Sequence, residues 1–268
     1  MTRIARCFES LKKEKKKALV TYVVNGDPSP TTVLPTMHAL VDNGADIIEL
    51  GVPFSDPMAE GPVIQLGHER ALANGASLKS SIEAVKRFRE TNQTTPVVLM
   101  GYENPIERMG YEAFAKSASD AGVDGLISVD LPPEEATELN ALLKNVGIDN
   151  IFLLSPSTTL ERAKHIISLA TGFLYYVSLK GVTGAGHLDV NAVNKRLAEF
   201  RTLTDLPICV GFGIKNGDTA KAVTESADGA VVGSLLVDKM GSMAGESDDD
   251  IASAVGELVL PFRRTMDS

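Results

Sequence analysis

The chain has few cysteines and few basic residues, and both shortages exclude classes of protein. Its 268 residues include two cysteines, Cys7 and Cys209, whose spacing suits neither a disulfide framework nor a metal cluster. The formal net charge is −9, and no basic patch outweighs the acidic residues. Nucleic acid is therefore not expected as a partner, and no metal site is expected on this chain.

Long apolar runs are also missing. None reaches the roughly 18 residues that a membrane-spanning helix needs, and the N-terminus lacks the apolar centre of a signal peptide. We therefore expect no membrane association and a cytoplasmic location. The chain is still 44% hydrophobic, which allows a large core. Its length suits two small domains or one (β/α)₈ barrel of about 250 residues.

Eight short apolar runs alternate with longer amphipathic segments along the chain. The runs are continuous rather than alternating, as is typical of parallel strands buried on both faces. We expect strands at Ala18–Val24, Asp46–Leu50, Val97–Met100, Gly125–Val129, Ile151–Leu154, Phe173–Val177, Ile208–Val210 and Ala230–Val232. The segments between them show helical periodicity. They are Thr31–Val41, Leu78–Arg89, Tyr111–Ala121, Pro133–Val146, Leu160–Ala170, Val190–Phe200 and Asp218–Glu225.

A weak internal repeat supports one regular architecture. The segments 43–46, 121–125 and 226–229 each place a glycine or small residue where a helix ends and a strand begins. We predict an α/β fold, a single (β/α)₈ TIM barrel over residues 1–268, with an extra N-terminal helix at Ile4–Lys13. A last helix is expected at Ile251–Phe262. A doubly wound open sheet is the alternative.

The most informative stretch begins at Glu49, at the end of the second apolar run. If Ala45 and Ile47 point into the barrel, the alternation of side chains along a strand turns Glu49 into its mouth. Two more acids, Asp56 and Glu60, follow on a loop broken by prolines. This arrangement is typical of a proton-transfer site. The alternative is an ordinary ion pair between Glu49 and a basic residue at the rim.

Glycines gather after the last three expected strands, at 181–186, 211–214 and 231–234. Barrels commonly bind phosphate on the loops after strands 7 and 8, next to a helix N-terminus. We therefore expect a phosphate site there. The loop 181–186 is expected to close over a ligand, and His187, the next residue, could contact that ligand. Aromatic and aliphatic residues at the strand ends are expected to line an apolar pocket.

Several of these motifs together resemble one family, the tryptophan synthase alpha subunits. The resemblance covers residues 3 to 262 in order and spacing. It rests on Glu49-Leu-Gly-Val-Pro-Phe-Ser-Asp-Pro-Met-Ala-Glu-Gly-Pro62, Leu99-Met-Gly-Tyr102 with Asn104-Pro-Ile106, Val129-Asp-Leu-Pro-Pro-Glu-Glu135, Tyr175-Tyr-Val-Ser178 with Gly181-Val-Thr-Gly184, and Gly211-Phe-Gly-Ile214.

The resemblance implies a lyase of tryptophan biosynthesis. The family cleaves indole-3-glycerol phosphate to indole and glyceraldehyde 3-phosphate by a retro-aldol reaction. Glu49 matches the family's acid and base, and Glu60 matches a carboxylate that stabilises positive charge on the indole nitrogen. The indole passes to a beta subunit in an alpha2-beta2 heterotetramer. Pyridoxal phosphate is expected on the beta subunit, and no cofactor is expected on this chain.

The remaining family positions carry over residue by residue. Thr183 would order the closing loop, and Asp56 with the Pro132-Pro133 loop would face the beta subunit. The indole would be surrounded by Tyr22, Met100, Ile127, Tyr175 and Phe212, and the phosphate would be held by Gly184, Gly213, Gly233 and Ser234.

Glu60 is the departure within the catalytic motif, because the family usually has aspartate there. Lys180 and Glu103 are also unusual. Two other functions stay open. One is a different barrel enzyme, such as a free-standing indole-releasing lyase, which a beta subunit would not stimulate. The other is an inactive chain that only activates its beta partner, which would release no indole.

Overall fold

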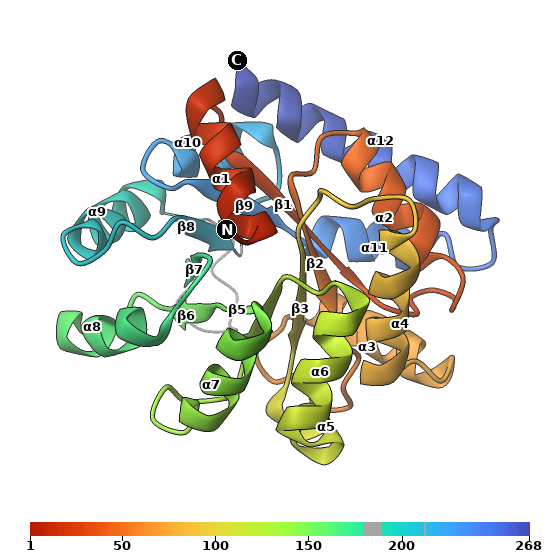
Figure 1. Cartoon of the computed structure of the whole chain (residues 1–268). Coiled ribbons are helices and arrows are strands. Elements are labelled where there is room, and N and C mark those ends of the chain that lie inside the picture. The colour runs from red at the N-terminus through yellow and green to blue at the C-terminus, as the bar shows by residue number, and fades with distance from the viewer. Residues whose placement is uncertain (179–188, 212) are drawn as a thin grey trace.

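The strands form a closed barrel, drawn in Figure 1. The computed structural model describes residues 1–178, 189–211 and 213–268. All strand pairs are parallel, and neighbours follow the order β5-β4-β3-β2-β1-β9-β8-β7-β6. The bounds are β1 Ala18–Val24, β2 Ile47–Gly51, β3 Val97–Gly101, β4 Gly125–Ser128, β5 Asp149–Asn150, β6 Phe152–Leu154, β7 Leu174–Val177, β8 Ile208–Gly211 and β9 Gly229–Val232.

The fifth strand of the barrel is split in two. β5 pairs with β4, and β6 pairs with β7 on the other side, with Ile151 between the two halves. Because these halves follow one another along the chain, the two edges of the sheet meet and the barrel closes. The predicted barrel is therefore confirmed, and the open doubly wound sheet is wrong.

Helices cover the outside and the base of the barrel. They are α1 Arg3–Glu14, α2 Val33–Asp42, α3 Pro62–Ala73, α4 Leu78–Arg89, α5 Glu103–Met109, α6 Tyr111–Ala121, α7 Thr137–Val146, α8 Leu160–Leu169, α9 Val190–Arg201, α10 Gly217–Thr224, α11 Ser234–Ser242 and α12 Asp248–Asp267. The helix expected from Pro133 starts instead at Thr137, since residues 133–136 form a turn. No helix in the described ranges is long and apolar enough to cross a membrane.

Three helices, α3, α5 and α11, were not predicted. The reason is clearest for α3, which has Gly67 in its middle. A Cβ at this position would lie 2.7 Å from Cγ1 of Val237 on α11, so close packing of the two helices requires the glycine. Glycine lowers the helical tendency of a segment, and this packing requirement therefore hid the helix.

The core has two layers because side chains alternate along each strand. Leu19 and Val23 of β1 belong to the outer layer between strands and helices. Val20, Tyr22 and Val24 point inward and join residues from the other strands in an inner cluster. α1 closes the base of this cluster, with Ile4 and Leu11 buried in it. Figure 1 shows α1, in red, in front of the strands.

Aspartates tie neighbouring strands together at the base. The carboxylate of Asp46 accepts a 2.8 Å hydrogen bond from the backbone N–H of Leu19. Asp124 accepts from Val97 and Asp228 accepts from Ile208, also at 2.8 Å. In each case the backbone N–H of the aspartate donates to the carbonyl of the same neighbour, at 2.8 to 2.9 Å. These aspartates occupy the same place in the three repeated segments.

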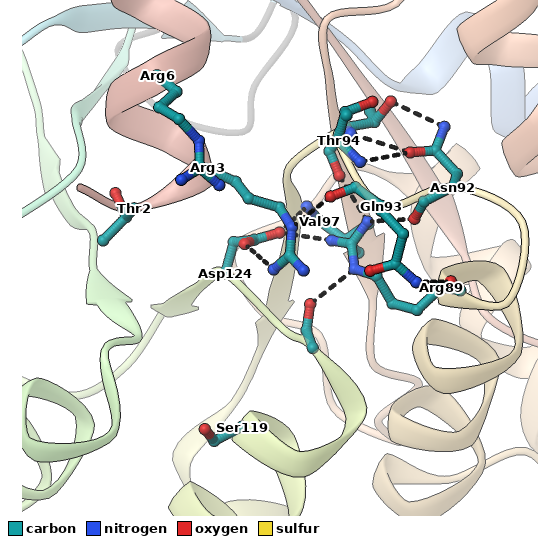
Figure 2. A network of polar contacts seen from close by, with 12 residues as sticks. Thr2, Arg3, Arg6, Arg89, Asn92, Gln93, Thr94, Val97, Ser119 and Asp124 are labelled. Carbon is teal, nitrogen blue, oxygen red and sulfur yellow. Dashed lines mark hydrogen bonds and ion pairs between the residues drawn. The ribbon is translucent and has the colours of Figure 1, made fainter.

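Each basal aspartate also pairs with arginine. Arg263 bonds Asp46 at 2.9 Å, and Arg201 bonds Asp228. Asp124 holds two, Arg3 of α1 at 2.9 Å and Arg89 of α4 at 2.5 Å. Figure 2 shows the guanidinium groups of Arg3 and Arg89 reaching Asp124 from two different helices. The first turn of α1 is thereby fastened to the barrel.

We expect replacement of Asp124 by alanine to destabilise the fold by about 3–5 kcal/mol, because it leaves the buried Arg89 charge without its carboxylate. Asp124 is 4% exposed and Arg89 6% exposed. Urea titration measures the change. Asp120→Ala, which breaks an exposed pair with Lys116 on α6, is the matched control and should leave the midpoint almost unchanged. Equal midpoints for the two variants would contradict the assignment.

Candidate active site

Glu49 lies in the mouth of the barrel, on the inward face of β2. Its neighbour in register on β1 is Tyr22. The Glu49 side chain is fully buried, and neither carboxyl oxygen has a hydrogen-bond partner among the described residues. No ion pair to a basic residue is found for it in those ranges, which disfavours the rim alternative. Burial raises the pKa of Glu49 to about 8, so the group is a carboxylic acid at neutral pH.

Four of the residues expected around an indole lie together in the inner cluster. Tyr22, Met100, Ile127 and Tyr175 are each at most 5% exposed and come from four different strands. Phe212, the fifth, lies outside the described residues, as do Thr183 and Gly184. The same holds for Lys180 and His187.

Two glycines make room for the tyrosine hydroxyls. A Cβ on Gly51 would lie 2.3 Å from Oη of Tyr22, and a Cβ on Gly211 would lie 1.9 Å from Oη of Tyr175. No other residue allows such an approach, so these strand-end glycines shape the wall of the pocket. Burial raises the pKa of both tyrosines well above the ordinary value, and Glu49 and Glu60 add to the rise. Both hydroxyls therefore stay protonated.

Glu60 ends the loop between β2 and α3 and is 6% exposed. The Tyr102 hydroxyl donates a hydrogen bond to its carboxylate and accepts one from the Ala59 N–H at 3.0 Å. The ring of Tyr102 stacks on Phe54 of the same loop, with centroids 4.9 Å apart. Burial raises the pKa of Glu60 above its ordinary value, and the hydrogen bond from Tyr102 offsets only part of this rise. The longer side chain at this position is therefore held in a defined place.

The described part of the expected phosphate site lies where β8 and β9 end. Gly213 has a φ of +76°, a conformation that favours glycine. Gly233 precedes α11, and Ser234 is the first residue of that helix. N–H groups in the first turn of a helix have no acceptor within the helix and suit an anion. The structure thus brings Gly213, Gly233 and Ser234 to the same end of the barrel as Glu49.

One residue of the site was missed from the sequence. His68 of α3 is 1% exposed, and its ring contacts both Tyr22 and the backbone of Phe54. Since α3 was not predicted, nothing along the chain indicated which way His68 points. Within the described ranges no group of three or more His, Cys, Asp or Glu side chains could hold a metal ion.

Comparisons with known proteins show the family to which the chain belongs. The sequence profile of the tryptophan synthase alpha chain family matches residues 8–262. The tryptophan synthase alpha chain of Thioalkalivibrio sulfidiphilus is 56% identical over 268 residues, all of both chains. The chain belongs to the tryptophan synthase alpha chain family. Its function is that of this family, a lyase of tryptophan biosynthesis that works without a cofactor of its own, the pyridoxal phosphate being on the beta subunit.

Solved structures give the same fold. The tryptophan synthase alpha subunit of Legionella pneumophila strain Paris has a TM-score of 0.91 at 43% identity, with 100% of this chain and 99% of that chain covered. A chain of the tryptophan synthase a2b2 complex of Pyrococcus furiosus has a TM-score of 0.83 at 38% identity, covering 92% and 98%.

We expect the buried carboxyl of Glu49 to make stability fall as pH rises. The unfolded chain releases this proton near 4.5 and the folded chain near 8, so folding is penalised progressively between these values. The glutamine of Glu49→Gln cannot ionise. The free energy of unfolding of this variant should therefore exceed that of the wild type by about 3 kcal/mol at pH 7 and by almost nothing below pH 4. Denaturant titration at both pH values measures this, and a gain independent of pH would contradict the burial argument.

Proposed function

We propose that Glu49 is the acid and base of the retro-aldol cleavage of indole-3-glycerol phosphate. Its protonated carboxyl donates a proton to C3 of the indole. The resulting carboxylate then removes the proton from the glycerol hydroxyl next to that carbon. The C–C bond breaks, its electron pair returns to the ring, and indole and glyceraldehyde 3-phosphate leave. The observation that carries this role is a buried, unpartnered carboxyl at the barrel mouth with a pKa of about 8.

Glu60 is assigned to the charge that develops on the indole nitrogen. Protonation at C3 makes this nitrogen positive, and a fixed carboxylate nearby stabilises it. The hydrogen bond from Tyr102 favours the charged form of Glu60 and fixes its direction. The extra methylene of Glu60 is accommodated by the loop, whose turn is held by a 3.2 Å bond from the Glu60 N–H to the Pro57 carbonyl.

The substrate would lie across the mouth. Tyr22, Met100, Ile127, Tyr175 and Phe212 would enclose the indole, and Gly184, Gly213, Gly233 and Ser234 would bind the phosphate. Thr183 would order the loop that closes over them. The apolar inner cluster and the N-terminus of α11 support this orientation.

The same face is assigned to a beta subunit in an alpha2-beta2 complex. Asp56 and Met58 lie on the loop that ends in Glu60, and both are exposed, Met58 by 73%. Leu66 of α3, the helix that follows this loop in the sequence, is 52% exposed. The Pro132-Pro133 turn would add to this surface. A partner on this loop would touch the segment that positions Glu60, which couples binding to catalysis. Two free thiols, Cys7 and Cys209, suit the reducing cytoplasm where we place the chain.

Glu49→Gln should reduce indole release by at least about 10³-fold, because both proton transfers are lost. The assay measures indole from indole-3-glycerol phosphate with the beta subunit present, and substrate binding measured separately should be nearly unchanged. Turnover close to that of the wild type would remove Glu49 from the mechanism.

The same assay separates the other two functions. A wild-type chain that releases no indole but stimulates the beta reaction would be a pure activator. A chain that releases indole at a rate the beta subunit does not change would be a free-standing lyase.

Glu60→Asp should keep or raise the turnover number if position 60 only has to supply a carboxylate to the indole nitrogen. Glu60→Gln is the comparison, since it keeps the size but loses the charge, and it should lower kcat by roughly 100-fold. A large loss with Asp would mean that the loop is adapted to the longer side chain.

A further inference from the structure

His68 connects three parts of the site that are distant in sequence. Its Nε2 lies 3.1 Å from Oη of Tyr22 on β1. Its Nδ1 accepts a 3.0 Å hydrogen bond from the backbone N–H of Phe54, at the start of the loop that leads to Glu60. The ring itself belongs to α3, and it is 1% exposed.

These contacts determine which nitrogen of the His68 imidazole carries the proton. An N–H group can donate only to a nitrogen with a free lone pair, so Nδ1 carries no proton. The proton of the neutral ring is on Nε2, which therefore donates to Oη of Tyr22. Burial lowers the pKa of His68 to about 4, so the ring stays neutral at physiological pH. His68 thus joins the loop to a strand of the barrel with one acceptor and one donor.

The loop carries this restraint to Glu60. Phe54, held through its N–H by His68, stacks its ring on Tyr102. Tyr102 accepts the Ala59 N–H and donates to the Glu60 carboxylate. Both ends of the segment 54–60 are therefore attached to buried side chains, His68 at one end and Tyr102 at the other.

We propose that His68 is a positioning residue for the lyase reaction, which it serves by fixing the loop 54–60 so that the Glu60 carboxylate stands over the indole nitrogen. The inference rests on the role proposed for Glu60. The essential atom of His68 is Nδ1, because Nδ1 holds the loop, whereas Nε2 anchors the imidazole ring to Tyr22. His68 itself touches neither substrate nor reacting atoms in this assignment.

The two nitrogens can be tested separately with amides. The Oδ1 of asparagine occupies the place of Nδ1 of His68, and the amide Nε2 of the longer glutamine reaches the place of Nε2 of His68 and can still donate to Tyr22. His68→Asn therefore keeps the acceptor for Phe54, while His68→Gln keeps the larger volume and the reach to Tyr22 but loses that acceptor. His68→Leu loses both contacts.

We expect His68→Leu and His68→Gln to lower kcat by roughly 100-fold with KM changed less than about threefold, since a shift near 1 Å of a catalytic group has such an effect. His68→Asn should recover kcat to within about fivefold of the wild type. The measurement is steady-state indole release by the full chain with the beta subunit. His38→Gln, on the outer helix α2, is the control and should match the wild type.

A packing role would give the opposite order, with glutamine better than asparagine, and that result would overturn the proposal. Wild-type kcat in His68→Leu would do the same. Thermal unfolding of each variant identifies any that fails to fold, and the ranking is then taken from the Asn and Gln pair.

Adding Glu60→Gln separates this inference from the role of Glu60. If His68 acts through Glu60, adding His68→Gln to the Glu60→Gln variant should lower kcat by less than about threefold. If the losses in kcat of the two single variants multiply in the double variant, the positioning role of His68 is wrong, while the role of Glu60 is unaffected. Unchanged kcat in Glu60→Gln alone would instead remove Glu60 from the mechanism.

Discussion

The barrel depends on a bond between each basal aspartate and the strand before it. Asp46, Asp124 and Asp228 each exchange hydrogen bonds with the first or second residue of a neighbouring strand. A parallel strand begins with an N–H that the sheet alone does not satisfy, and burying it without an acceptor costs roughly 1–3 kcal/mol. The carboxylate supplies the acceptor and the arginines neutralise it. Strand starts are therefore set in register at one end of the barrel, which fixes where the strands finish at the other.

The mouth of the barrel differs from the base in how its acidic residue is paired. Asp46, Asp124 and Asp228 at the base each pair with at least one arginine. Glu49 at the mouth is buried without a hydrogen-bond partner among the described residues. A buried carboxyl without a partner opposes folding once it ionises, so the rigid base carries a site that the fold does not favour. Burial among apolar side chains has two effects on Glu49. It raises the pKa, which makes the group suitable for proton transfer, and it lowers the stability of the fold.

Much of this was predictable from the chain. Continuous apolar runs located the strands, and the alternation around Glu49 placed its carboxyl in the mouth. The glycines and small residues of the three repeated segments indicate where helices end, but the sequence of these segments gives no sign of the role of Asp46, Asp124 and Asp228. The aspartates matter only through a strand that lies elsewhere in the sequence. His68 was missed for the same reason, since its role depends on the spatial approach of residues 22 and 54. The break at Ile151 has no signal in the local sequence.

The helix α1 has a consequence for molecular traffic. With Ile4 and Leu11 seated in the base and Arg3 fastened to Asp124, this helix blocks the end of the barrel that lies away from Glu49. As far as the described residues show, a molecule that reaches Glu49 therefore enters and leaves at the other end, past the loop that carries Glu60. A protein bound over that end would meet each molecule that passes. The N-terminal helix thus gives the passage of substrate and product a direction that no residue of the active site supplies.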